Sequence, residues 1–126
     1  MKPLIYIAGP ISKGDWMLNC RRALEIAKKL IDGGFAVYVP QLSIFWHLVF
    51  LHSQPSWWLD HVDYAILSRC DALIRLPGES VGADAEVAFC EQNKIPVYVS
   101  VEDLFQCRPI LKPIPTIPFS RAQEVE

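Results

Sequence analysis

The stretch ALIRLPGESVGADAEVAFC, residues 72–90, predicts a strand, a glycine-broken turn and a helix in direct succession. Its first five residues are typical of a short buried strand, and helical spacing of small and apolar residues begins after Ser80. Glu86 then falls one or two turns into that helix. Because open α/β sheets bind ligands at the carboxyl ends of their strands, we expect the chemistry of the protein to lie here.

The rest of the chain repeats this alternation of strand and helix. We expect strands at residues 4–8, 35–39, 72–76 and 96–99, and helices at residues 16–31, 56–70 and 80–93 and from residue 100 onward. Ser56, Ser80 and Ser100 are candidate N-caps, whereas residues 40–55 form a long, apolar, loop-like connection. The alternation predicts an α/β fold with a single doubly wound parallel sheet of four to five strands, in flavodoxin-like or Rossmann-like order, and helices on both faces.

Composition predicts one globular domain, residues 1–107, since 52% of the 126 residues are apolar and only 21% are charged. The prolines of residues 108–126 favour an extended C-terminal arm over a helix or a central strand. A formal net charge of −2 without a long basic run argues against binding to a nucleic acid polymer. No stretch has the roughly 18 apolar residues that a membrane span needs.

The cysteines and histidines predict neither disulfides nor a metal site. Cys20, Cys70, Cys90 and Cys107 are widely separated and form no Cys-x-x-Cys pair. We interpret them as reduced thiols of a cytoplasmic protein, two of them in core positions. His47 and His52 have no third ligand nearby, and residues 1–8 form a first strand rather than a signal peptide.

The loop after the first strand is a second candidate ligand site. Its sequence GPISKG, residues 9–14, offers backbone N–H groups, a hydroxyl and an ammonium ahead of a helix N-terminus, which suits an anion. A plain βα turn with a glycine at each end explains it equally well, because no complete phosphate-binding motif is present. For Glu86 the structural alternative is a favourable interaction with the helix macrodipole, but its apolar neighbours favour a functional role.

Three segments together resemble the nucleoside 2-deoxyribosyltransferase superfamily. They are YIAGPI (residues 6–11), Asp63 followed by CDAL (residues 70–73), and GADAE (residues 82–86). The resemblance covers about residues 4–99 and is closest to the short members that hydrolyse nucleoside 5′-monophosphates at the N-glycosidic bond. It implies a cofactor-independent enzyme with a small nucleotide substrate, assembled as a homodimer or larger homo-oligomer.

The resemblance also implies roles for single residues. Glu86 matches the nucleophile, Tyr6 the tyrosine that hydrogen-bonds it, and Asp63 the helical aspartate near the leaving base. A carboxylate below the anomeric carbon stabilises an oxocarbenium-like state or forms a covalent sugar adduct, and an acid must protonate the base. Asp60, one turn earlier, is the rival acid, and the spacing to Asp71 favours Asp63.

Ser80 distinguishes subclasses within the resemblance. Transferases acting on free nucleosides carry an aspartate there, which would repel a phosphate, whereas the monophosphate hydrolases carry a serine. A compatible role for Ser80 is that of a helix N-cap. Lys13 would supply the point charge where those hydrolases have an arginine. The implied substrate-binding residues are Gly9, Pro10, Ile11, Ser12, Lys13, Ser80 and Gly82.

Trp46, Trp57 and Trp58 are candidates for stacking on the nucleobase, and His47, His52 or His61 for contact with it. The alternative is core packing or a subunit interface. Two other functions remain open. One is a deoxyribosyltransferase that exchanges bases by the same covalent chemistry. The other is a nucleotide-binding sensor that does not turn its ligand over.

Overall fold

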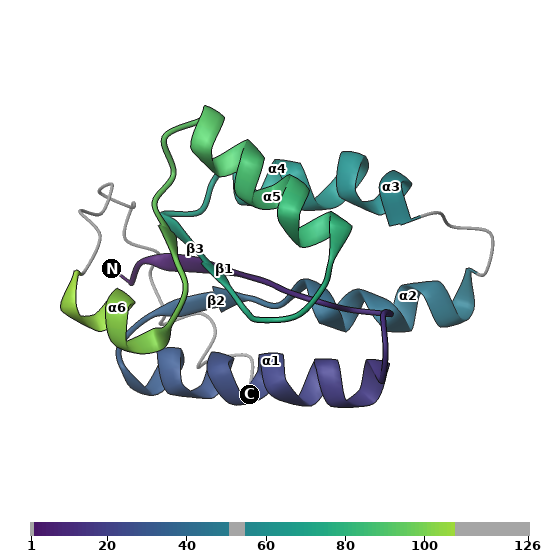
Figure 1. The fold of residues 1–126 in the computed structure, drawn as a ribbon, viewed down its shortest axis with the longest axis horizontal. Coiled ribbons are helices and arrows are strands. Elements are labelled where there is room, and N and C mark those ends of the chain that lie inside the picture. The colour runs from purple at the N-terminus through teal and green to yellow at the C-terminus, as the bar shows by residue number, and fades with distance from the viewer. Residues whose placement is uncertain (1, 51–54, 108–126) are drawn as a thin grey trace, which may run out of the picture.

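A parallel sheet forms the centre of the molecule, as the computed structural model shows for residues 2–50 and 55–107 (Figure 1). Within these residues the sheet has four strands in the order β2-β1-β3-β4. The strands are β1 (Leu4–Ala8), β2 (Ala36–Tyr38), β3 (Ala72–Arg75) and β4 (Val97–Tyr98). This order confirms the predicted α/β class with a flavodoxin-like, doubly wound sheet.

Helices cover both faces of the sheet (Figure 1). One face packs against α1 (Trp16–Asp32) and α6 (Val101–Gln106), and the other against α4 (Tyr64–Leu67) and α5 (Val81–Gln92). Successive side chains of a strand point to opposite faces. Ile5 and Ile7 therefore join the core beneath α1, whereas Tyr6 and Ala8 face α5. Tyr6 pairs in register with Leu73, and Ala8 with Arg75, so the side chain of Arg75 also faces α5.

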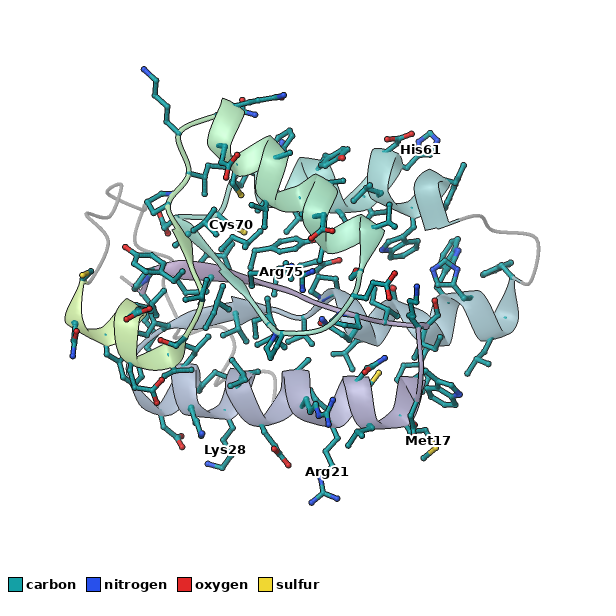
Figure 2. The ribbon with its side chains drawn as sticks, in the orientation of Figure 1. Met17, Arg21, Lys28, His61, Cys70 and Arg75 are labelled. Atoms are coloured by element: carbon teal, nitrogen blue, oxygen red, sulfur yellow. The ribbon has the colours of Figure 1, made fainter. Side chains whose placement is uncertain are left out.

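Side-chain caps begin three of the helices. The carboxylate of Asp15 accepts the Leu18 N–H at the start of α1, and the hydroxyls of Ser80 and Ser100 cap α5 and α6. The two serine caps were predicted and are confirmed. The outer face of α1 is solvated, with Met17, Arg21 and Lys28 pointing away from the sheet (Figure 2).

Residues 40–49 are helical, so the prediction of a loop-like connection was wrong there. Pro40–Ser43 form a 3₁₀ turn, η1, and Ile44–Val49 form the helix α2. Pro40 suits the first helical position because that position needs no N–H donor. The helix has apolar side chains on all sides, and such a segment shows no helical periodicity in the sequence.

The predicted helix at residues 56–70 is interrupted by a π-helical turn. The chain runs from α3 (Pro55–Trp58) through the π-helix η2 (Leu59–Asp63) into α4. Ser56 lies inside α3 and is not its N-cap, which corrects the prediction. The wider turn changes which residues face the sheet after Leu59, and π-turns of this kind are frequent at functional sites.

The four cysteines are free thiols, and Cys70 and Cys90 are buried, as predicted. Figure 2 shows Cys70 between the sheet and the helices above it. No helix among the described residues is both long and apolar enough to cross a membrane. His52 and the predicted arm at residues 108–126 lie outside the described residues.

Candidate active site

A cavity of about 530 Å³ opens at the carboxyl ends of β1 and β3. The sheet order reverses between these strands, and ligands of doubly wound folds bind at that position. The volume is in the range of small-molecule sites. The lining comes from the loop after β1 (Gly9, Ile11, Ser12), from the η1–α2 segment (Ser43, Ile44, His47), from α3 and η2 (Trp58, Leu59, Asp63), and from the start of α5 (Ser80, Val81, Gly82, Ala83, Ala85, Glu86).

Glu86 is a buried carboxyl group held by a tyrosine. It lies on α5 with only 5% of its surface exposed, and the hydroxyl of Tyr6 on β1 donates a hydrogen bond to its Oε2. Burial raises the pKa of Glu86 to about 8. The hydrogen bond from Tyr6 favours the ionised form and opposes that effect. The structure thus brings Tyr6 and Glu86 together in the arrangement that the family resemblance implies.

Asp63 is a second buried carboxyl group in the same cavity. The hydroxyl of Tyr38, at the end of β2, donates to its Oδ1 at 3.4 Å. Burial raises the pKa of Asp63 to about 7, against smaller opposing effects of Trp58 and Tyr38. Burial, followed by the proximity of Asp63, raises the pKa of Tyr38 to about 12, so this hydroxyl remains a donor.

The π-turn explains why Asp63 rather than Asp60 lines the cavity. Both belong to η2, but Asp60 is exposed and Asp63 is buried at the last position of the turn. The indole N–H of Trp58, one helical turn before Asp63, is buried and makes no hydrogen bond within the usual distance and angle limits. Its proximity favours the carboxylate form of Asp63, against the larger effect of burial.

The N-terminus of α5 forms one end of the cavity. The Ser80 hydroxyl accepts the Ala83 N–H at 3.1 Å, while the first turn of a helix leaves other N–H groups without helical acceptors. A Cβ atom added at Gly82 would meet nothing within 4 Å, so this residue leaves open space. Gly9, Ile11 and Ser12 also line the cavity. These features suit an anion such as phosphate.

Two of the predicted substrate-binding residues do not line the cavity. Lys13 instead forms an exposed ion pair with Glu79, with Nζ and Oε1 2.8 Å apart. Pro10 packs beside Gly78, where an added Cβ would lie 2.8 Å from the Pro10 Cγ. Both residues contact the loop after β3 rather than the cavity.

Trp58 and His47 line the other end of the cavity, with their rings edge to face at a centroid distance of 5.7 Å. Of the three tryptophans predicted to stack on the base, Trp58 thus lines the cavity, whereas Trp46 and Trp57 do not. The rings of Trp46 and Trp57 stack on each other, with their centroids 6.2 Å apart, and the two residues are 38% and 42% exposed. Consecutive helical residues point about 100° apart, so the orientation of Trp58 turns Trp57 away from the cavity.

Sequence reasoning missed two polar residues of the site. Tyr38 was treated as part of a strand, and Ser43 as part of the connection after it. Tyr38 contacts Asp63, and Ser43 lines the cavity with a buried hydroxyl. Tyr38 has a recognisable signal, because it is a polar residue at the carboxyl end of a strand. Ser43 has none, because its position in the cavity depends on the 3₁₀ turn η1, which was not predicted. Among the described residues no three His, Cys, Asp or Glu side chains are placed to hold a metal ion.

The fold and the cavity define a doubly wound α/β domain with two buried carboxyl groups at its topological switch point. The chain belongs to the family described as Domain of unknown function (DUF4406), which matches residues 3–99. The matched region runs from before β1 to after β4 and includes all the residues that line the cavity. A comparison with curated proteins finds no match.

Proposed function

We propose that this chain hydrolyses the N-glycosidic bond of a nucleoside 5′-monophosphate and releases a free base and a sugar 5-phosphate. The observation that carries the proposal is the pair of buried carboxyl groups, Glu86 and Asp63, which reach one cavity from different elements. Pairs of carboxyl groups are the usual means of cleaving glycosidic bonds. The resemblance to the nucleoside 2-deoxyribosyltransferase superfamily supports the same chemistry.

The two carboxyl groups have different partners, which suits them to different roles. The ionised Glu86, with its Oε2 fixed by Tyr6, attacks the anomeric carbon while the carbon–nitrogen bond to the base breaks. The protonated Asp63 gives its proton to the departing base. Water then cleaves the glycosyl ester, with Asp63 accepting a proton from the water, and Glu86 is regenerated as a carboxylate.

The ends of the cavity orient this substrate. The 5′-phosphate lies at the N-terminus of α5, near Ser80 and Gly82, where the helix dipole favours an anion. The base lies toward Trp58 and His47, whose rings offer a stacking surface. The exposed apolar side chains of α2, among them Phe45 and Val49, support the homo-oligomer that the resemblance implies.

The proposal is tested by the release of free base from a panel of ribo- and deoxyribonucleosides and their 5′-monophosphates. We expect at least one monophosphate to be cleaved with a kcat/KM well above that of its nucleoside. Equal kcat/KM for the monophosphate and its nucleoside would show that the enzyme does not recognise the 5′-phosphate. Addition of a second base separates hydrolysis from transfer, because a transferase would convert it into a new nucleoside or nucleotide.

Ser80→Asp should raise KM for the monophosphates by at least about tenfold, because it places a carboxylate against the phosphate dianion. Aspartate is as good an N-cap as serine, so the helix is preserved. Activity on free nucleosides should change little. Ser80→Ala removes one hydrogen bond and should cost only about 1 kcal/mol in binding. A Ser80→Asp enzyme with unchanged KM would show that the phosphate lies elsewhere.

The pH dependence of kcat/KM should be bell-shaped, because the active pair of carboxyl groups carries one proton. Between the pKa values of about 7 for Asp63 and about 8 for Glu86 the pair holds one proton, and the active form is the one with that proton on Asp63. The rate should therefore rise through pH 7, as the pair loses its first proton, and fall above pH 8, as it loses the second. The second pKa of a phosphate ester is about 6, below both limbs. A profile that is flat between pH 6.5 and 9 would contradict a reaction that uses this pair.

A further inference from the structure

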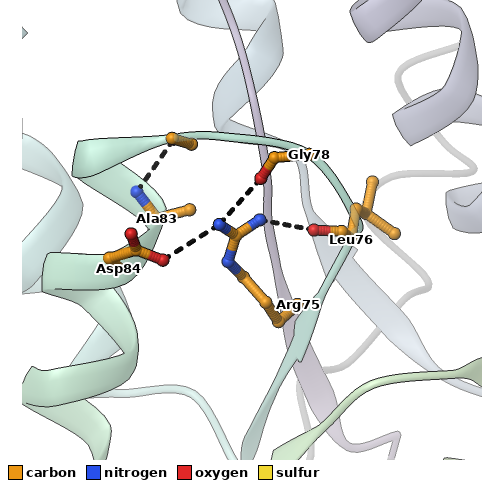
Figure 3. A network of polar contacts seen from close by, with 6 residues as sticks. Arg75, Leu76, Gly78, Ala83 and Asp84 are labelled. Atoms are coloured by element: carbon orange, nitrogen blue, oxygen red, sulfur yellow. Dashed lines mark hydrogen bonds and ion pairs between the residues drawn. The ribbon is translucent and has the colours of Figure 1, made fainter.

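We propose that Arg75 is a positioning residue that fixes the loop after β3 and the first turn of α5, and thereby shapes the phosphate end of the cavity. The inference rests on the proposed function and extends it to a residue outside the cavity lining. It is carried by three contacts that the guanidinium of Arg75 makes with this loop and with α5 (Figure 3).

The contacts join the loop after β3 to α5. Arg75 Nη1 donates to the carbonyl oxygen of Leu76, and Nη2 donates to the carbonyl oxygen of Gly78 at 3.0 Å. The same Nη2 lies 3.0 Å from Oδ1 of Asp84 on α5. Figure 3 shows the guanidinium between the loop and the helix. One rigid planar group therefore sets the distance between residues 76–78 and the helix.

The position of Arg75 favours a structural origin for its effect on the ligand. Its side chain is 17% exposed, and it lies between the sheet and α5 (Figure 2). It is not among the residues that line the cavity. Ser80 and Gly82, which lie in the sequence between the contacted residues Gly78 and Asp84, do line the cavity. Arg75 thus acts on the ligand through the backbone that it holds.

The carbonyl contacts also orient the electrostatic field of the loop. In a trans peptide the N–H and C=O groups point in opposite directions, and the described residues contain no cis peptide bond. The Gly78 carbonyl points to Arg75, so the Glu79 N–H points away from the guanidinium. The partial negative charges of two loop carbonyls are thus neutralised at Arg75 rather than left free to face an anion.

Gly78 makes the loop after β3 dependent on the contacts of Arg75. Its φ of +116° lies in the region that favours glycine, and the side chain of Pro10 occupies the space that a Cβ atom would need. A loop with this freedom has other conformations available in the absence of a partner for its carbonyls. The ion pair between Lys13 and Glu79 is largely exposed and contributes little to fixing it.

Arg75→Lys is the variant that tests the inference, because lysine keeps the charge but cannot contact both carbonyls and Asp84 with one planar fork. We expect kcat/KM for the monophosphate to fall about tenfold, mainly through KM. Activity on the matching free nucleoside should change less than about twofold. A role in stability alone would lower the melting temperature and leave this substrate preference unchanged, which would overturn the inference.

The controls separate positioning from charge and folding. Arg21→Lys changes an exposed arginine that pairs with Glu25 at 3.0 Å on the outer face of α1, and it should leave the preference unchanged. Asp84→Asn keeps an acceptor for Arg75 and should give a smaller loss in the same direction. If Arg75→Lys does not fold, Asp84→Ala supplies the test, and an unchanged preference in that variant also overturns the inference.

A readout without turnover distinguishes failure of this inference from failure of the proposed function. Inorganic phosphate is titrated into the wild-type protein and into Arg75→Lys while the amide resonances of Gly82 and Ala83 are followed by NMR. A wild-type protein that binds phosphate but cleaves no nucleotide would refute the proposed glycosidase activity. The inference about Arg75 would still hold in that case if Arg75→Lys binds phosphate several-fold more weakly than the wild type. Equal binding by the two proteins, or none by the wild type, would refute the positioning of a phosphate site by Arg75.

Discussion

Replacement of Glu86 by glutamine should lower kcat for base release by at least about 10³-fold while the fold is retained. The amide is nearly isosteric and its oxygen still accepts the hydrogen bond from Tyr6. It cannot attack the anomeric carbon or stabilise the positive charge of the sugar, and loss of such a group is among the largest single effects on a rate. The measurement is the single-turnover and steady-state release of base from the preferred monophosphate.

Glu91→Gln is the matched control for this variant. Glu91 lies on the same helix, is exposed, and does not line the cavity, so its replacement should leave turnover unchanged. Substrate affinity of Glu86→Gln should stay near that of the wild type. Turnover within a few-fold of the wild type would exclude Glu86 as the nucleophile.

The same variant should be more stable than the wild type at alkaline pH. The folded-state pKa of Glu86, about 8, is above its ordinary value of 4.5, so the folded protein holds a proton that the unfolded chain releases between these values. The wild type therefore loses free energy of unfolding as pH rises from about 4.5 to 8, and the glutamine variant does not. At about 1.4 kcal/mol per pKa unit, the gain at pH 8.5 is on the order of 5 kcal/mol. Urea denaturation should show this difference at pH 8.5 and almost none at pH 4.5.

The framework of the fold could be predicted because it depends on local patterns. Short apolar runs ended by glycine, amphipathic spacing in α1 and serine caps at α5 and α6 are all signals within a few residues. The strand order then follows from the rules for parallel sheets. The helix α2 and the π-turn η2 could not be predicted, because one is apolar on every side and the other depends on one extra residue per turn.

The candidate site was predicted partly from position within an element and partly from the family resemblance. Glu86 and Ser80 lie at fixed distances from the start of α5, whereas Tyr6 and Asp63 were predicted only through the resemblance. The orientation of Trp58 relative to Trp57 depends on the rotation of a helix, and the contact of Tyr38 with Asp63 depends on long-range packing. Such tertiary contacts leave no pattern in a single sequence.

Asp63→Asn should lower kcat for a natural nucleotide by about 10²-fold, the usual contribution of one general acid. Asparagine keeps an oxygen that accepts the Tyr38 hydroxyl, so the helix and the cavity should be preserved. The loss should be much smaller on a nitrophenyl riboside 5-phosphate, because that leaving group departs without a proton. The alkaline fall of the pH profile should also disappear, since only the ionisation of Glu86 then remains.

Asp60→Asn is the control that gives this prediction its specificity, since Asp60 belongs to the same π-turn but is exposed. If Asp63 supplies the proton, Asp60→Asn should retain wild-type rates on both substrates and the full bell-shaped profile. An equal loss with the natural and the activated substrate in Asp63→Asn would mean that this residue positions the sugar or the base. Loss of the alkaline limb in Asp60→Asn instead would transfer the acid role to the exposed carboxylate, and burial of Asp63 would then have no catalytic meaning.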